Sequence, residues 1–269
     1  MFGSILRTLT VGLVAASASV AAVQLPPHAP RGTSEHYRRT PGQVVTKCTV
    51  PNTVALTFDD GPWVYLYDVS KALIAAGGKG TFFFRGGADG CIYNEAQAKR
   101  VKYAYDKGHQ VASHTWAHLN MSSLNWDQLH NEMWNVEEAI WKITGAYPSF
   151  VRPPYGEYNP TVVEAARARG QTIALWDFDS LDWSLDADSI KKRYKDLVDS
   201  RPSNVNALNH EVHQHSAQVV IPYAIDILKK AGYKLVTLAE CLGQPAYQFT
   251  GTPAARDASW TCEGKATKV

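Results

Sequence analysis

From residue 53 onward, short apolar runs alternate with longer amphipathic stretches, and this alternation constrains the fold more than any other feature of the chain. Each apolar run is rich in Val, Ile, Phe or Thr, as buried parallel strands tend to be. The predicted strands are Thr53–Asp59, Gly80–Phe84, Gln110–His114, Phe150–Pro153, Thr172–Asp177, Val205–Asn209 and Lys234–Leu238.

The stretches between these runs have helical periodicity. The predicted helices are Leu66–Ala76, Glu95–Lys107, Trp126–Thr144, Pro160–Arg169, Ala187–Ser200 and Ala217–Ala231. Strands that alternate with helices predict a parallel sheet covered by helices. We therefore expect a single α/β domain, a distorted seven-stranded β/α barrel. An open doubly wound sheet is the alternative, because periodicity alone cannot show closure.

The ends of the chain have a different character. Arg7 precedes an apolar run of small residues from Leu9 to Val23, which is typical of a secretory signal peptide and too short to span a bilayer. We expect a secreted protein, in the extracellular space or the cell wall, without a membrane span. The expected divisions are 1–22 as signal peptide, 23–45 as pro-segment or disordered lead-in, 46–243 as the barrel domain and 244–269 as a C-terminal tail.

Four cysteines, Cys48, Cys91, Cys241 and Cys262, suit two disulfides in an oxidising compartment. Three pairings are possible. We favour Cys48–Cys241, because these residues flank the first and last predicted strands, which are neighbours in a closed barrel.

Charge and motifs outside the strands say little about partners. The formal net charge is +2 and the chain has no basic stripe with interleaved aromatic residues, which argues against nucleic acid as a partner. A monomer is the default expectation. Asn120-Met121-Ser122 is an acceptor sequence for N-glycosylation.

Ionisable residues follow five of the seven predicted strands at their carboxyl ends, where β/α barrels carry their active sites. They are Asp59 and Asp60 after the first strand, His114 and His118 after the third, Arg152 after the fourth, Asp177, Asp179 and Asp182 after the fifth, and His210 after the sixth. A coincidence at one strand is plausible, but a coincidence at five is not. This rim of the barrel is therefore the predicted active site.

Metal binding is the chemistry that this rim favours. His114 and His118 are four residues apart, so on one face of a helical turn they can bind one ion. A carboxylate from the first strand completes a His-His-Asp set with open positions for water and substrate. Such a set suits Zn²⁺, although Co²⁺, Mn²⁺ or Ni²⁺ could occupy it. Burying Arg152 alone is costly, so we expect a carboxylate partner across the barrel mouth.

Five segments, in this order, resemble the motifs of the polysaccharide deacetylases of carbohydrate esterase family four, and within it those of secreted fungal chitin deacetylases. The segments are Thr57–Pro62, Ser113–His118, Arg152–Gly156, Asp179–Trp183 and Leu208–His210. The likeness covers Cys48 to Gly243, so residues 46–243 would be the deacetylase catalytic domain.

The resemblance implies a role for each matching residue. The implied roles are Asp59 as general base, Asp60, His114 and His118 as ligands of zinc, Arg152 as the partner that orients Asp59, the backbone N–H of Tyr155 as oxyanion donor, His210 as general acid held by Asp182, and Trp183 as a wall of the acetyl pocket. Glu211 departs from the Asp that often follows the acid histidine in this family. His213 and His215 are expected to face solvent, and Trp63, Trp116, Tyr155 and Trp183 lie near the predicted rim, where they could stack on sugar rings.

The implied function is metal-dependent hydrolytic N-deacetylation of chitin or chitooligosaccharides, which releases acetate and leaves glucosamine units. An acetylxylan esterase or a peptidoglycan deacetylase would use the same chemistry on another substrate. A non-catalytic carbohydrate-binding homologue is the third alternative, and it predicts a decayed set of site residues. All of the motif residues are present.

Overall fold

The computed structural model describes residues 40–87 and 90–265. The predicted signal peptide and most of the predicted lead-in lie outside these described residues. Within them, no helix is both long enough and apolar enough to cross a membrane.

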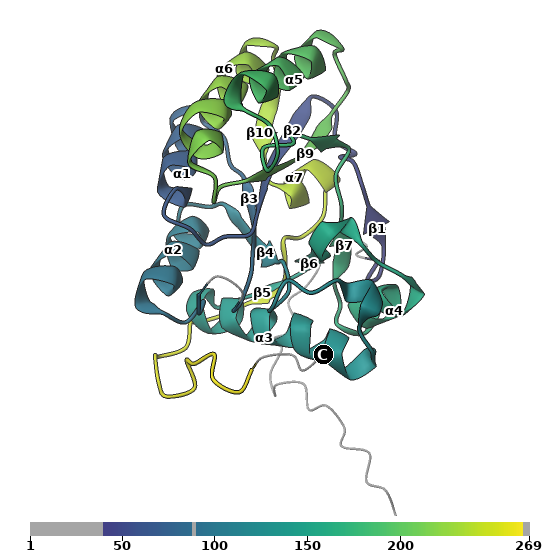
Figure 1. Ribbon diagram of the computed structural model, residues 1–269, viewed down its shortest axis with the longest axis vertical. Coiled ribbons are helices and arrows are strands. Elements are labelled where there is room, and N and C mark those ends of the chain that lie inside the picture. The colour runs from purple at the N-terminus through teal and green to yellow at the C-terminus, as the bar shows by residue number, and fades with distance from the viewer. Residues whose placement is uncertain (1–39, 88–89, 266–269) are drawn as a thin grey trace, which may run out of the picture. The chain divides into compact units, whose positions relative to one another are not determined.

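Parallel strands form the centre of the described part of the chain (Figure 1). In spatial order they are β1 (Val44–Val45), β7 (Thr172–Ala174), β6 (Phe150–Val151), β4 (Gln110–Ser113), β3 (Thr81–Phe84), β2 (Thr53–Asp59), β9 (Val205–His210) and β8 (Phe178–Asp179), and β10 (Lys234–Val236) also pairs with β2. Every pairing among these strands is parallel.

The sheet curls into a nearly closed barrel, which confirms the predicted fold class. β1 and β8 are the two ends of the strand order. Asn206 in β9 spans the gap between them: its Nδ2 donates to the carbonyl oxygens of Thr46 and Leu175, at 3.0 and 2.9 Å. The Asp177 N–H also donates to the Asn206 carbonyl at 3.1 Å. Side-chain and loop hydrogen bonds thus take the place of backbone strand pairing between the two ends of the sheet.

Helices surround the sheet in Figure 1. They are α1 (Leu66–Ala75), α2 (Glu95–Asp106), α3 (Trp126–Thr144), α4 (Pro160–Ala168), α5 (Ala187–Asp199) and α6 (Ile221–Lys230), with a π-helical turn, η3 (Ser216–Val220), directly before α6 and short 3₁₀ turns η1 (Met121–Ser123) and η2 (Pro154–Gly156). α3 has the predicted bounds, because Asn125 caps its start in a capping box with Gln128 and Gly145 ends it at φ 73°.

Side chains of each strand alternate between the helices and the barrel interior. In β2, Val54, Leu56 and Phe58 pack into the core cluster shared with the helices. Ala55 belongs instead to a second cluster inside the barrel. Asp59 shares the inward face with Ala55 and therefore points into the barrel at the carboxyl end of the strand.

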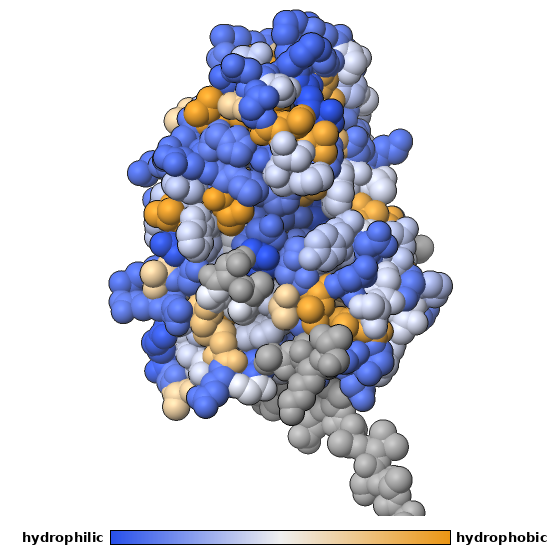
Figure 2. Space-filling view, in the orientation of Figure 1, coloured by the Kyte–Doolittle hydropathy of each residue, from blue (hydrophilic) through white to orange (hydrophobic). Residues whose placement is uncertain are grey.

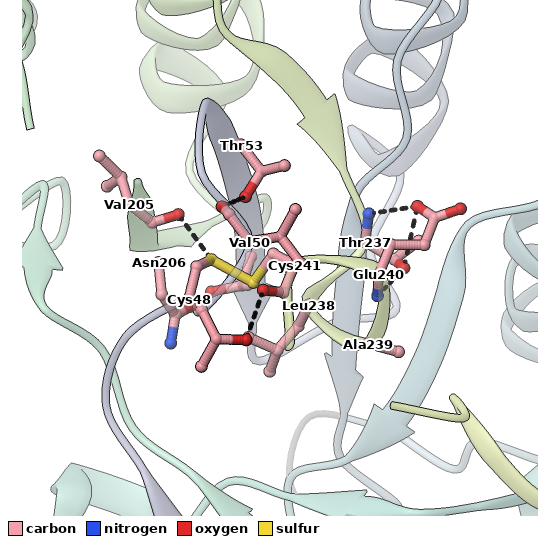
Figure 3. The surroundings of a disulfide bond; sticks show 12 residues. Cys48, Val50, Thr53, Val205, Asn206, Thr237, Leu238, Ala239, Glu240 and Cys241 are labelled. Carbon is pink, nitrogen blue, oxygen red and sulfur yellow. Dashed lines mark hydrogen bonds between the residues drawn. A yellow bond between two sulfur atoms is a disulfide. The ribbon is translucent and has the colours of Figure 1, made fainter. Parts of the chain in front are cut away.

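The opposite end of the barrel is filled by α7 (Leu238–Leu242). Its first N–H groups donate to Thr81 Oγ1 and Gln110 Oε1, at 2.8 and 2.9 Å, where β3 and β4 begin. Cys241 of this helix forms a disulfide with Cys48, which confirms the favoured pairing (Figure 3). Leu238, Ala239, Cys241 and Leu242 of this helix belong to the cluster inside the barrel, so apolar side chains fill this end.

Four short strands of the described residues, namely β1, β5 (Ala146–Pro148), β8 and β11 (Tyr247–Thr250), lie where the sequence indicated no strand. β11, in the predicted tail, pairs antiparallel with β5. The second disulfide, Cys91–Cys262, ties the tail to the segment before α2. The two disulfides are in line with an oxidising compartment.

On the face shown in Figure 2, hydrophilic residues cover most of the surface and hydrophobic residues form small separate patches.

Candidate active site

Three predicted metal ligands meet at the carboxyl end of the barrel. One ligand atom each from Asp60, His114 and His118 lies within 4.8 Å of the other two. Asp60 Oδ1 is 3.5 Å from His114 Nε2 and 3.3 Å from His118 Nε2. This oxygen is buried and has no hydrogen-bond partner. Among the described residues, its one cationic neighbour is Arg85 Nε at 3.4 Å. A buried carboxylate oxygen that accepts no hydrogen bond and lies between two imidazole nitrogens fits a divalent cation, so the group could hold a metal.

The two histidines are brought together by a loop, and the predicted helical turn is wrong. Residues 114–118 are not helical. Thr115 and His118 instead have left-handed backbone, with φ of 67° and 56°. Similar values occur at other motif positions, namely Asp60 (74°), Tyr155 (61°) and Leu181 (59°). Side chains other than glycine rarely adopt this conformation, and it clusters at functional sites.

Neighbouring groups prepare the imidazoles for coordination. His114 Nδ1–H donates to the Arg152 carbonyl at 2.7 Å, which leaves its Nε2 lone pair facing Asp60. Burial, with the nearby His114, lowers the pKa of His118 to about 3, so this ring is neutral. Burial acts to raise the pKa of Asp60, but His114, Arg85 and His118 outweigh it and hold that pKa below its usual range. The set thus offers two imidazole nitrogens and one carboxylate.

Arg152 is fully buried and pairs with Asp59. This confirms the expectation that a buried arginine here has a carboxylate partner. Its Nη1 donates to Asp59 Oδ1 at 2.8 Å and to Thr57 Oγ1 at 2.7 Å. Its other nitrogens donate to the carbonyls of Ala174 and Leu175, at 3.1 and 3.0 Å. The guanidinium also stacks on Phe83, 4.1 Å from the ring centroid. Asp59 is therefore held in one orientation.

His210 lies beside Asp59, because β2 and β9 pair with these two residues in register. Its Nδ1 is 2.7 Å from Asp182 Oδ1, and its backbone N–H donates to Asp182 Oδ2 at 2.7 Å. Burial acts to lower the pKa of His210, but the hydrogen bond and charge of Asp182, with Asp59 and Asp60, raise it to about 9. The imidazole is therefore protonated at neutral pH.

The rim around these groups is partly aromatic. Tyr155 and Trp183 are among the most exposed large side chains, at 67% and 58%, and Trp63 is 39% exposed. The Tyr155 ring lies 4.9 Å from that of His118. Trp116 is 2% exposed and packs in the core, so its predicted place among the sugar-stacking residues is wrong.

A cavity of about 280 Å³ opens beside Asp60, and it is lined by Asp60, Gly61, Pro62, Trp63, Arg85, Gly90, Gln97, Val212 and His213. His213 thus faces this cavity, and His215 Nε2 donates to the Asp182 carbonyl at 3.1 Å. His215 is therefore tied to the site, which corrects the expectation that it faces solvent, while His213 is half-buried at the cavity wall. Asn120 of the predicted glycosylation sequence is exposed, just before η1.

Sequence reasoning assigned no role to two residues that shape the site. Thr57 is the second acceptor of Arg152, and its position two residues before Asp59 on the inward face was an available signal. Glu211 is fully buried, and its Oε1 accepts the Trp63 N–H at 3.3 Å. A Cβ on Gly61 would lie 1.9 Å from the same oxygen, so glycine is required there while Glu211 keeps this position. Burial raises the pKa of Glu211 to about 8.

The sequence profile of the polysaccharide deacetylase family matches residues 46–174. A chitin deacetylase of Pestalotiopsis sp. is 34% identical over 203 residues, which are 75% of this chain and 67% of that protein. A probable peptidoglycan-N-acetylglucosamine deacetylase of Arthroderma benhamiae is 34% identical over 218 residues, which are 79% of this chain and 49% of that protein.

Among solved structures, the chitin deacetylase from the fungal pathogen Colletotrichum lindemuthianum matches with a TM-score of 0.74 and 27% identity. The match covers 78% of this chain and 96% of that one. Sequence and structure therefore confirm the resemblance: the chain belongs to the polysaccharide deacetylases of carbohydrate esterase family four and is a hydrolase of that family.

Proposed function

We propose that this protein is secreted and hydrolyses the N-acetyl groups of chitin or chitooligosaccharides in a metal-dependent reaction, releasing acetate and leaving glucosamine units. One observation carries the proposal. The Asp60–His114–His118 set, the Arg152–Asp59 pair and the Asp182–His210 pair converge at the open end of one barrel. A non-catalytic homologue has no need to keep all three.

Zinc is the proposed metal, held by Asp60, His114 and His118. Deacetylases of this family are metal-dependent, and two imidazoles with one carboxylate suit Zn²⁺, with Co²⁺ as an alternative. When bound, such an ion lowers the pKa of a water and polarises a carbonyl.

Asp59 is the proposed general base and His210 the proposed general acid. Arg152 holds Asp59 in place at the barrel mouth, where it can take a proton from the attacking water. His210 carries the proton that the leaving amine needs, because Asp182 favours the imidazolium. Charge that develops on the acetyl oxygen would be met by the backbone N–H of Tyr155, and Trp183 would wall the acetyl group.

Chitin is favoured over peptidoglycan and acetylated xylan as the substrate. Two of the relatives described above are named chitin deacetylases, although the Arthroderma protein is named for peptidoglycan. The exposed rings of Trp63, Tyr155 and Trp183 suit the apolar faces of sugar rings. None of these features rejects an acetylated xylan by itself, so substrate preference belongs in the experiment.

The metal site predicts a zinc-dependent gain in stability. At free zinc about 100 times the Kd, the melting temperature of metal-stripped protein should rise by about 5–10 °C. His118→Ala should abolish most of this rise, because it removes one of three ligands. His130→Ala, a histidine on α3 outside the site, is the matched control and should keep it. Differential scanning calorimetry measures both, and an unchanged rise in His118→Ala would argue against this ligand set.

The pH dependence of turnover tests His210. The acid must be protonated, so kcat should fall as the pH rises through the His210 pKa, which Asp182 raises. In Asp182→Asn the negative charge is gone, so this alkaline fall should move to lower pH, and kcat at its optimum should drop about a hundredfold. Profiles of kcat against pH for both proteins give the comparison. An alkaline limb at the same pH in both would contradict the pairing of acid and carboxylate.

Acetate release tests the function as a whole. The purified protein should release acetate from N-acetylglucosamine oligomers, lose this activity on chelation and regain it with zinc. Acetylated xylan and peptidoglycan serve as competing substrates in the same assay. Acetate from xylan alone would move the substrate to the esterase alternative. No acetate from any polymer, with a folded and zinc-loaded protein, would favour the binding-protein alternative.

A further inference from the structure

The buried carboxylate of Asp182 has a third hydrogen-bond donor besides the two from His210. Asp182 is 1% exposed and Ser216 is fully buried. Ser216 Oγ–H donates to Asp182 Oδ2 at 2.5 Å, the same oxygen that accepts the His210 N–H. The other oxygen, Oδ1, is thereby left to face only the imidazole of His210 among the described residues.

The serine comes from the segment that leads into α6. Ser216 is the first residue of this segment, the π-helical turn η3. His215, the residue before it, donates from Nε2 to the Asp182 carbonyl oxygen at 3.1 Å. Two consecutive residues of one turn therefore hold the carboxylate and the backbone of Asp182. Wide π turns recur at functional sites, where they redirect side chains that a regular helix would place elsewhere.

A buried carboxylate needs donors for both oxygens, because burial penalises its charge. Burial acts to raise the pKa of Asp182, but the hydrogen bonds and charge of His210, together with the Ser216 hydroxyl, keep it below its usual range. Without the hydroxyl, Oδ2 would keep one backbone donor, and the carboxylate could rotate about its Cβ–Cγ bond. Rotation would turn Oδ1 away from the imidazole Nδ1.

We propose that Ser216 is a positioning residue for His210: its hydroxyl fixes the plane of the Asp182 carboxylate, and that plane sets the orientation of the imidazole. The inference rests on the proposed function, in which His210 delivers a proton to the leaving amine. It adds a residue that touches neither the substrate nor the reacting atoms.

Ser216→Ala tests the proposal in the full-length protein. We expect kcat for acetate release to fall about tenfold while KM changes less than about twofold, because only proton delivery is affected. Ser216→Thr keeps the hydroxyl and should regain most of the activity. The matched control is Ser70→Ala, a fully buried serine on α1 whose Oγ lies 2.8 Å from His109 Nε2. It should lose stability and keep kcat.

NMR of ¹⁵N-histidine-labelled protein adds a readout that a merely structural role would not move. The Nδ1–H signal of His210 is identified by its loss in Asp182→Asn. In Ser216→Ala this signal should shift and exchange faster with solvent, and in Ser70→Ala it should not change. The signal is seen without turnover, so it tests the positioning role even if the wild-type protein releases no acetate.

Two results would overturn the proposal. One is a Ser216→Ala protein with wild-type kcat and an unchanged His210 signal. The other is a loss of kcat that does not report on His210. This would be so if the His210 signal stayed unchanged in Ser216→Ala, or if Ser70→Ala lost kcat to the same extent. Either finding would make the effect one of general stability. Should Ser216→Thr fold poorly, the two alanine variants still decide between these outcomes.

Discussion

Asp59→Asn should lower kcat by about a thousandfold while zinc content stays at the wild-type level. The asparagine has nearly the same shape, and its amide oxygen can still accept from Arg152 Nη1, which donates to Asp59 Oδ1 at 2.8 Å in the structure. An amide cannot take a proton from water, so only the base is lost. Steady-state acetate release and elemental analysis of the bound metal measure the two quantities.

The same substitution at another rim carboxylate is the control for Asp59→Asn. Asp177 Oδ1 accepts the Asn206 N–H at 2.7 Å, and an asparagine at position 177 can keep that bond. Asp177→Asn should therefore leave kcat within about twofold of wild type, as surface substitutions usually do. A zinc-loaded Asp59→Asn enzyme with wild-type turnover would show that another group acts as the base.

Arg152→Met should lower the free energy of unfolding by about 3–5 kcal/mol, since it leaves a buried carboxylate without its partner. Methionine has similar bulk but no donors. Asp59 would lose its charged partner, and the carbonyls of Ala174 and Leu175 would lose the donors they now have. Turnover should fall with stability, because Asp59 would no longer be held in one orientation. Urea denaturation and acetate release measure the two effects.

Arg169→Met is the control for Arg152→Met. Arg169 pairs with Glu137, whose side chain is fully buried, and both belong to helices or loops outside the site. A similar loss of stability is expected there, but with unchanged kcat. If Arg169→Met also lowered kcat, the loss in Arg152→Met would reflect destabilisation alone. If Arg152→Met kept wild-type stability, the buried pair would contribute less than its geometry indicates.

The main elements of the fold were predictable because the burial of a strand or of one helix face gives the sequence a recognisable pattern of apolar residues. β2 and α3 have the predicted bounds, since one is buried along its length and the other has a cap at each end. β1 and β11 were not predicted. Each is short and lies at an edge, and its pairing depends on partners far along the chain, which no local pattern encodes.

The residues of the site were also predictable only in part. Residues at strand ends were predictable, because parallel strands bring their carboxyl ends to one rim. The loop that joins His114 to His118 was not, because left-handed backbone at Thr115 leaves no trace in hydrophobic periodicity. Ser216 lies six residues beyond His210 at the start of η3, and its contact with Asp182 joins segments that are 34 residues apart in the sequence.

The two disulfides keep the domain in one molecule even after a single cut in its backbone. Cys48–Cys241 and Cys91–Cys262 enclose overlapping stretches, with sequence separations of 193 and 171 residues. A protease that cuts any single peptide bond between residues 48 and 262 therefore produces two pieces that remain covalently joined. Such a cut opens a ring and releases no fragment. The proposed catalytic groups all lie inside these rings, so the enzyme can lose the continuity of its backbone and still keep its active site in one molecule.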